Sequence, residues 1–252
     1  MRSTERRSRL LEALQLGEVD VEDLARRFAV SESTVRRDLQ RLAADNAVRR
    51  TYGGAILLGR GRETTLGERL DERGAEKRAI AQAALAFIED GDTLLLDAGS
   101  TVLALGPLLA GRRLRIITNN LVLPPLLVGE PDIEMIVLGG TLRSSSMGTV
   151  GPLAVEALRR LTADKAFLSA DGIVAGRGLC EAHLDQVALK SRMMEQARET
   201  IVLADATKLG RAEQSAWAPL PAHWRLITDA TATDHQLATM AAAGAEVTLA
   251  TV

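Results

Sequence analysis

The chain has 252 residues, of which 46% are hydrophobic and 25% are charged, and it contains a single cysteine. This composition is typical of a globular protein of one or two domains, and it excludes a disordered, fibrous or disulfide-stapled chain. The charged N-terminus lacks the apolar core of a signal peptide, and no stretch is suited to spanning a bilayer. We therefore expect a cytoplasmic protein with no membrane partner.

The formal net charge of −2 is unevenly distributed along the chain. Residues 1–60 contain 12 Arg, no Lys and 9 acidic residues, a net charge of +3, whereas residues 61–252 carry a net charge of −5. We interpret this as a mildly basic head on an acidic body. A basic segment favours a nucleic-acid partner, and an aromatic content of 2% leaves little material for stacking on single strands.

Helical periodicity in the head predicts three helices, over residues 4–15, 21–28 and 32–44. The second and third are separated only by Ala29-Val30-Ser31, and two helices joined by so short a turn form a helix-turn-helix. Ser31 is the expected N-cap of the third helix. Residues 47–57 then predict a strand, a Gly-Gly turn and a second strand, which would form a small wing.

The third helix has one apolar and one polar face. At 100° per residue, Val35, Leu39 and Leu42 share a face and are expected in the core. Arginine can bond bidentately to guanine and glutamine to adenine, so the opposite face suits a major groove. The alternative is a three-helix bundle whose charged face is solvated or binds protein. The candidate DNA-binding residues are Ser31, Ser33, Thr34, Arg36, Arg37, Gln40, Arg41, Arg50, Tyr52 and Gly53.

The head resembles the DeoR family of bacterial transcription regulators. The resemblance runs from Arg7 to Ala55 and includes SESTVRRDLQRL (residues 31–42) and RRTYGGA (residues 49–55). Within the family's VSxxTIRRDLxxL core, only Val35 departs, replacing isoleucine. The resemblance implies a winged helix-turn-helix, placed here at residues 3–58, in which Arg36 and Arg37 contact operator DNA.

Residues 59–76 are charged, contain glycine and have weak periodicity, so we expect a linker there and a second domain over 77–252. In that domain apolar runs of strand length alternate with helical stretches, which predicts an α/β fold with a mostly parallel sheet covered on both faces. The first helix is expected to begin near Lys77. The predicted strands are Thr93–Leu96, Leu114–Ile117, Glu134–Leu138, Lys165–Ser169, Thr200–Leu203, Arg225–Ile227 and Glu246–Leu249, and helices are predicted near 101–110, 121–128, 152–161, 185–198 and 235–243.

Short polar residues and glycines follow most of these strands. Ligands of open parallel sheets bind at the carboxyl ends of the strands, so these clusters would converge on one site. Each cluster by itself has an alternative reading as an ordinary turn. Together they suit a polyhydroxy ligand with an anionic group, and a phosphosugar is the simplest instance. The candidate effector-binding residues are Asp97, Gly99, Ser100, Thr101, Thr118, Asn119, Asn120, Gly139, Gly140, Arg143, Asp171, Gly172, Lys190, Asp205 and Lys208.

The body also resembles the DeoR family, in its C-terminal sensor domain. The matching runs are DGDTLLLDAGST (90–101), ITNN (117–120), LGGTLR (138–143), FLSADGI (167–173) and LADATKLG (203–210). The resemblance implies a fold similar to ribose-5-phosphate isomerase and CoA transferases, with a phosphorylated sugar as effector. The family often has acidic residues just before its lysine; here Gln186 and Ala188 precede Lys190, so we expect different effector contacts there.

We therefore predict a DNA-binding transcription regulator, a repressor of a carbohydrate-catabolism operon that acts as a dimer or tetramer. An enzyme related to the isomerases or transferases, and an adaptor that binds protein, are the alternatives. No nucleophile–base pair stands out, so no enzyme activity is expected. The three histidines lack the spacing of metal ligands, and no G-x-G-x-x-G fingerprint is present. We expect neither a metal nor a cofactor.

Overall fold

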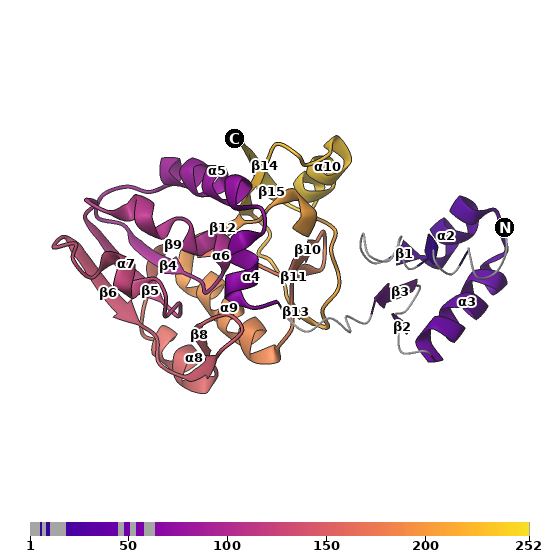
Figure 1. The fold of residues 1–252 in the computed structure, drawn as a ribbon, viewed down its shortest axis with the longest axis horizontal. Helices are drawn as coiled ribbons and strands as arrows, with labels where there is room; N and C mark the ends of the chain where they lie inside the picture. The colour runs from indigo at the N-terminus through magenta and orange to yellow at the C-terminus, as the bar shows by residue number, and fades with distance from the viewer. Residues whose placement is uncertain are drawn as a thin grey trace.

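The computed structural model describes residues 6, 9–10, 19–44, 48–50, 54–57 and 64–251 (Figure 1). For residues 19–20, 43–44, 48–50 and 54–57 it describes the backbone only. Most of the helix predicted over 4–15 lies outside these residues, although the described part of it is helical. Tyr52, Gly53 and residues 58–63 of the predicted wing and linker also lie outside.

The head contains the predicted helix-turn-helix. The helices α2 (Val21–Phe28) and α3 (Glu32–Ala44) pack against each other. The wing strands β2 (Val48–Arg50) and β3 (Gly54–Leu57) are antiparallel. A third strand, β1 (Val19–Asp20), pairs with β3 and was not predicted from the sequence. A strand of two residues is too short to leave a periodic pattern.

A small apolar core holds the two helices together. Leu24 and Val35 are fully buried at its centre, and Leu39 and Leu42 join them from α3, as predicted. Leu10 is buried in the same cluster, which ties the described part of the N-terminal segment to the helix-turn-helix. The turn between α2 and α3 places Ala29 at φ 50°, in the left-handed region.

The second domain is built on a seven-stranded sheet in the order β15-β14-β12-β9-β4-β5-β6, and every pairing in it is parallel. Each predicted strand corresponds to one of these seven. Successive strands run outward in both directions from β4 and β9, so the topological switch point lies between these two. The strands are β4 (Thr93–Leu96), β5 (Leu114–Thr118), β6 (Ile133–Val137), β9 (Ala163–Leu168), β12 (Ala197–Leu203), β14 (Trp224–Asp229) and β15 (Ala245–Ala250).

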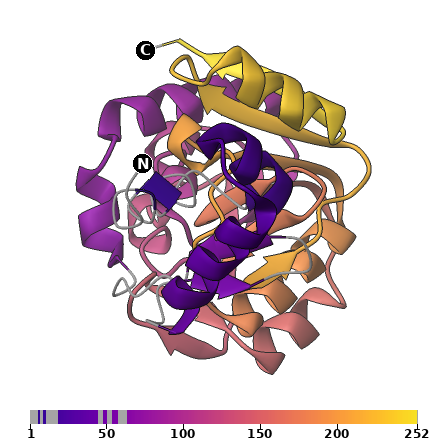
Figure 2. The same cartoon turned by 90° about the vertical axis from the view of Figure 1, so that its right-hand side faces the viewer.

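Two apolar clusters, one on each face of the sheet, form the core. Neighbouring residues of one strand enter opposite clusters, as Leu94 and Leu95 do, because side chains alternate across a strand. On one face lie α5 (Gly74–Ala84), α6 (Ser100–Leu103) and α7 (Pro124–Leu127). On the other lie α8 (Pro152–Leu158), α9 (Leu184–Gln196) and α10 (Asp234–Ala242), and Figure 2 shows α10 alongside β15.

Several short elements were not predicted. The strands β7 (Thr141–Arg143) and β8 (Gly148–Val150) form a hairpin. A small antiparallel sheet contains β10 (Gly172–Val174), β11 (Gly178–Glu181) and β13 (Ala216–Ala218). Single 3-10 turns form η1 (Leu85–Phe87) and η3 (Ala206–Lys208), and the helix predicted near 101–110 is divided into α6 and the 3-10 turn η2 (Gly106–Leu109). Elements of three or four residues show too few repeats for a periodicity to be recognised.

The segment expected to be a linker contains one short helix and the beginning of a second, separated by a turn at residues 72–73. A capping box between Thr65 and Glu68 starts α4 (Leu66–Asp71), and Leu66 is buried in the sensor core. The next helix, α5, begins at Gly74 rather than near Lys77. The region 59–76 therefore overlaps two helices that belong to the second domain. No helix among the described ranges is long and apolar enough to cross a membrane.

Candidate functional site

The start of α3 is fixed by its serine cap. Ser31 Oγ accepts a hydrogen bond from the backbone N–H of Thr34 at 3.3 Å and lies 2.9 Å from the hydroxyl oxygens of Ser33 and Thr34. The buried Val35 and Leu39 turn the opposite side of the helix outward. Five polar side chains predicted to contact DNA are exposed on this helix: Ser33, Arg36, Arg37, Gln40 and Arg41. The side chain of Arg50 and the whole of Tyr52 and Gly53 lie outside the described part of the chain.

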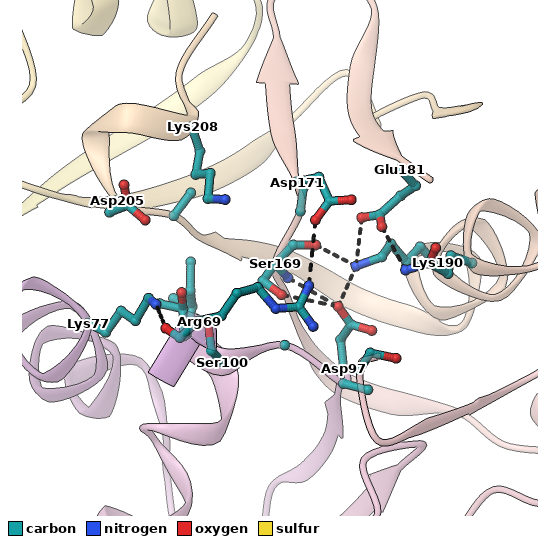
Figure 3. A pocket seen from close by; sticks show the side chains of 18 of the residues that line it. Arg69, Lys77, Asp97, Ser100, Ser169, Asp171, Glu181, Lys190, Asp205 and Lys208 are labelled. Carbon is teal, nitrogen blue, oxygen red and sulfur yellow. Dashed lines mark hydrogen bonds and ion pairs between the residues drawn. The ribbon is translucent and has the colours of Figure 1, made fainter. Parts of the chain in front are cut away.

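A pocket lies at the carboxyl end of the parallel sheet, around the switch point between β4 and β9 (Figure 3). Its walls come from the connections that follow β4, β9 and β12, from α9, and from the α4–α5 segment. The structure brings nine of the fifteen candidate effector-binding residues to its lining. These are Asp97, Gly99, Ser100, Thr101, Asn119, Asp171, Lys190, Asp205 and Lys208.

The other six candidates, Thr118, Asn120, Gly139, Gly140, Arg143 and Gly172, do not line the pocket. Thr118 is fully buried and its hydroxyl donates to the carbonyl of Leu96 at 2.6 Å, which links β5 to β4. Gly172 allows a close approach of chains, since a Cβ there would lie 2.1 Å from the carbonyl oxygen of Arg211.

Gly139 and Gly140 lead from β6 into the β7–β8 hairpin and are exposed. Gly140 has φ 141°, and a Cβ there would lie 2.5 Å from the carbonyl oxygen of Val150. The close approach at Gly140 thus serves the hairpin, whereas nothing lies within 4 Å of a Cβ at Gly139. Arg143, at the end of β7, donates to the hydroxyl of Ser145 at 3.3 Å.

At the centre of the pocket Lys190 is buried between two carboxylates. Its Nζ donates to Asp97 and to the carbonyl of Ser169, and lies 3.0 Å from Oε1 of Glu181 (Figure 3). The side chains of Lys190, Asp97 and Glu181 are 6%, 5% and 2% exposed. The sequence therefore brings together residues from the ends of β4 and β11 and the middle of α9.

Burial and charge act in opposite directions on this cluster. Burial would lower the pKa of Lys190, but the carboxylates of Asp97 and Glu181 outweigh it and raise that pKa. Burial raises the pKa of Glu181 to about 8, although Lys190 opposes the shift. Lys190 is therefore charged at neutral pH and Glu181 mostly protonated, which leaves a near-neutral centre.

Gln186 lies beside this centre. Its Nε2 donates to Glu181 at 3.0 Å, and its Oε1 is buried without a hydrogen-bond partner among the described residues. The acids expected near Lys190 by resemblance are absent from α9, but Glu181 on β11 supplies one from another element. Sequence reasoning missed Glu181 because β11 is too short to show a periodic pattern, so this strand was not predicted.

The first turn of α6 lines the pocket and follows a tightly packed connection from β4. Ser100 and Thr101, 7% and 5% exposed, line the pocket. The first backbone N–H groups of a helix have no intrahelical acceptor, so they can bind an anion. Gly99 permits the close packing here, because a Cβ at this position would lie 1.7 Å from Oγ of Ser169.

Lys208 contributes positive charge from η3. Burial lowers its pKa, and the neighbouring Arg211 lowers it further. Asp205 caps the same turn, since its Oδ1 accepts from the backbone N–H of Thr207 at 3.1 Å. Arg211 is paired with Glu213, so it is already neutralised in part.

The α4–α5 segment lines the pocket although it falls within the expected linker. The T-x-x-E capping box at Thr65 and Glu68 is the sequence pattern that could have predicted a helix here. The lining residues that sequence reasoning did not propose as effector contacts include Arg69, Glu72, Arg73, Lys77, Ser146, Ser169, Glu181, Gln186, Thr207 and Arg211.

The lining suits an anion that also carries hydroxyl groups. Six cationic and five acidic side chains line the pocket: Arg69, Arg73, Lys77, Lys190, Lys208 and Arg211, against Glu72, Asp97, Asp171, Glu181 and Asp205. Within the described ranges no three His, Cys, Asp or Glu side chains gather as a metal site would require. Burial raises the pKa of the nearby Cys180 thiol to about 12, so it is a packed thiol and not a reactive one.

A winged helix-turn-helix joined to an α/β domain with a polar pocket at the switch point of its sheet defines a ligand-responsive DNA-binding regulator. Residues 6–60 match the DeoR-like helix-turn-helix domain, and residues 72–230 match the DeoR C terminal sensor domain. The chain belongs to the DeoR family of transcriptional regulators.

Individual relatives agree with this assignment. The chain is 34% identical over 227 residues to the uncharacterized HTH-type transcriptional regulator YulB of Bacillus subtilis, covering 89% of this chain and 88% of that protein. It is 34% identical over 213 residues to the glycerol-3-phosphate regulon repressor of Escherichia coli, covering 84% of each. Among solved structures, ribose 5-phosphate isomerase A of Methanocaldococcus jannaschii matches with a TM-score of 0.38, 19% identity and 52% of each chain covered.

Proposed function

We propose that this regulator represses a carbohydrate-catabolism operon and that a phosphorylated sugar or a related metabolite sets its operator affinity. One observation carries the proposal. Asn119, Asp171 and Gln186 all line the pocket, and each has a buried oxygen atom without a hydrogen-bond donor among the described residues. Buried acceptors in native proteins are nearly always paired, and the hydroxyls of a sugar are donors of the required kind.

The charges of the pocket support the anionic part of the ligand. Cations outnumber acids in the lining even before the protonation of Glu181 is considered. Ser100 and Thr101, in the first turn of α6, line the same cavity. The glycerol-3-phosphate regulon repressor, a relative of similar length, is named for a small phosphorylated polyol.

The head is proposed to bind double-stranded operator DNA through α3 and the wing. Arg36 and Arg37 are its central contacts, because both guanidinium groups are exposed on α3 near its capped end. Replacing both with alanine should abolish operator binding. The same variant should keep the wild-type thermal stability of the sensor domain, since neither residue is in the core. Unchanged operator affinity would contradict this assignment.

Control is proposed to act by linkage between the two domains. A ligand that binds better to the state with low operator affinity shifts the population away from DNA. A head with a net charge of +3 neutralises few phosphates, so two or more heads binding together would be needed for tight binding. We therefore propose a cytoplasmic dimer or tetramer, which sedimentation at micromolar concentration would distinguish from a monomer.

Catalysis is the alternative function. The observation that favours it is the pKa of about 8 for Glu181. A carboxylate of that basicity could accept and donate protons near neutral pH. However, Lys190 and Gln186 both hold this carboxyl group, and an enzyme has no use for the helix-turn-helix. We propose no catalytic activity and no cofactor. An assay of ribose 5-phosphate isomerisation should give the uncatalysed rate.

The test of the proposal is a thermal-shift panel in which each phosphosugar is compared with its unphosphorylated partner. A ligand present at about 100 times its Kd stabilises the folded state by about 2.7 kcal/mol. We expect one phosphorylated compound to raise the melting temperature while its unphosphorylated partner does not. A panel without any shift would contradict a phosphosugar effector.

A further inference from the structure

The wall of the pocket includes the helix that follows the DNA-binding head in the chain. Residues 58–65 separate the wing strand β3 from α4, and α4 with its junction to α5 contributes Arg69 and Arg73 to the lining. Both side chains come from outside the clusters at the strand ends. Figure 3 shows Arg69 reaching from α4 toward Asp171 and the centre of the pocket.

Arg69 is a buried cation with incomplete partners. Its side chain is 13% exposed, and its Nη1 lies 3.6 Å from Oδ1 of Asp171, which is too far for a hydrogen bond. Its Nη2 donates to the carbonyl of Ser145 in the β7–β8 hairpin at 3.2 Å. Its Nε is buried and has no hydrogen-bond partner among the described residues, and the same is true of Oδ2 of Asp171.

Arg73 repeats this arrangement at the α4–α5 junction. It adopts φ 51°, its Nη2 lies 3.1 Å from Oε1 of Glu76, and its guanidinium lies 3.7 Å from Asp205 and 3.7 Å from Asp229. Its Nη2 donates to the hydroxyl of Thr231 at 3.1 Å. Its Nε is also buried without a partner within the described ranges. Both arginines thus keep unused donors of the forked kind that bind phosphate and carboxylate groups.

Three of the other four cations in the pocket lining are more fully engaged. Lys190 is held by Asp97 and Glu181 together, and Arg211 pairs with Glu213. Lys77 donates to the carbonyls of Arg69 and Glu72, so it closes the end of α4. Lys208 has no hydrogen-bond or ion-pair partner among the described residues, and Arg69 and Arg73 each keep a buried Nε–H without an acceptor, so these three cations have free capacity for an anion.

We infer that Arg69 and Arg73 bind the anionic group of the effector, which makes the helix next to the head a part of the sensor site. The inference rests on the proposed function and adds to it the residues that recognise the anion. An anion on Arg69 competes with the contacts to Asp171 and Ser145 that now hold α4 on the sensor domain. Occupancy then changes how α4 is held, and α4 continues toward the head.

The test measures binding of inorganic phosphate and of the phosphosugars in the panel by isothermal titration calorimetry. The full-length wild type is compared with Arg69→Gln, Arg73→Gln and Arg78→Gln. Arg78 is the matched control because it is exposed on α5 and does not line the pocket, so replacing it removes the same charge elsewhere. We expect affinity to fall about tenfold or more in the first two variants, as the loss of a charge-assisted hydrogen bond implies, and by less than about twofold in the control.

Two further measurements separate recognition from folding and test the role of α4. Arg69→Lys keeps the charge without the fork, so it should recover part of the lost affinity if the fold of the variant is intact. Hydrogen exchange of residues 64–77 should change when the wild type binds its ligand and should not change in Arg69→Gln at the same ligand concentration.

The outcomes distinguish the inference from the proposed function. If the wild type binds a phosphosugar and both glutamine variants bind it equally well, the anionic group lies elsewhere; the inference is then wrong and the proposed function stands. If the wild type binds neither phosphate nor any phosphosugar, both are wrong. Weaker binding in the variants together with unchanged exchange in α4 of the wild type would overturn the link to the head.

Discussion

At the scale of residues, the pocket depends on one lysine that is held between two buried acidic side chains. Asp97, Glu181 and Lys190 come from three separate elements and are each at least nine-tenths buried. Burying charges is unfavourable unless each is paired, so removing the cation leaves two carboxyl groups without their partner. The same groups set the electrostatic character of the ligand site.

Replacing Lys190 with methionine should therefore destabilise the sensor domain by about 3–5 kcal/mol. Urea unfolding followed by tryptophan fluorescence measures this, because Trp217 and Trp224 both lie in that domain. Arg159→Met is the control: Arg159 forms an exposed pair with Glu156, and such pairs contribute about 0–1 kcal/mol. A loss below about 1 kcal/mol for the Lys190 variant would show that the buried cluster does not depend on its cation.

The pKa of Glu181 predicts a dependence of stability on pH. Because burial raises this pKa to about 8, the folded state keeps a proton between roughly pH 4.5 and 8 that the unfolded chain releases. The free energy of unfolding should therefore decrease as pH rises through this interval. Lys190, Asp97 and Asp171 are the charged groups that act on Glu181, and Gln186 is its neutral hydrogen-bond donor.

In Glu181→Gln the side chain cannot titrate, so we expect a flatter profile of stability against pH from 5 to 8. Melting temperatures of the wild type and the variant, measured in parallel across this range, give the comparison. Taking the difference between the two removes the contribution of the three histidines. Parallel profiles would mean that Glu181 titrates at its ordinary pKa in the folded protein.

At the scale of elements, the connection between β4 and α6 shows how packing fixes the site. A Cβ at Gly99 would lie 1.7 Å from Oγ of Ser169. The carbonyl of Ser169 in turn accepts a hydrogen bond from Nζ of Lys190. Gly99→Ala must therefore shift α6 or the end of β9. We expect a loss of about 1–3 kcal/mol in stability together with a weakened thermal shift by the effector.

The control for this variant is Gly129→Ala, because no atom lies within 4 Å of a Cβ at Gly129. It should change stability by less than about 0.5 kcal/mol and leave the thermal shift by the effector intact. Wild-type stability and ligand response in Gly99→Ala would mean that the connection adapts without strain.

The elements that the sequence predicts well are those with repeated patterns. The apolar runs of the seven strands are long enough to be recognised, and α3 has three buried residues at helical spacing. The short strands β10, β11 and β13 carry no such repeat, so Glu181, which lies on β11, could not be assigned to the pocket. Arg69 and Arg73 were missed for another reason: their charged, glycine-containing surroundings resembled a linker.

The candidate effector site shows the same division. Residues directly after strands β4, β9 and β12 reach the pocket because parallel strands end at one edge of the sheet, as Asp97, Asp171 and Asp205 do. Gly139 and Gly140 follow the edge strand β6, where the chain turns into a hairpin instead. Distance from the switch point decides which strand end can contribute, and strand order is not readable from a single sequence.

Across the whole molecule, we propose that the DNA-binding head and the sensor domain act as one unit. The basic head and the acidic body divide the two functions between the domains. The chain between them enters the sensor through α4, whose junction with α5 is part of the pocket wall. A ligand in the pocket can therefore contact the segment that connects the sensor domain to the DNA-binding head.

The most direct test of this claim is the operator affinity of the full-length wild type with and without a phosphosugar. The operator is a duplex selected by the protein from a random pool, and fluorescence anisotropy at fixed salt measures the Kd. We expect a saturating phosphosugar from the thermal-shift panel to change the Kd by about fivefold or more, the lower end of typical allosteric coupling, while its unphosphorylated partner leaves it unchanged. Tight operator binding that no phosphosugar alters would contradict the control of operator affinity by a phosphosugar.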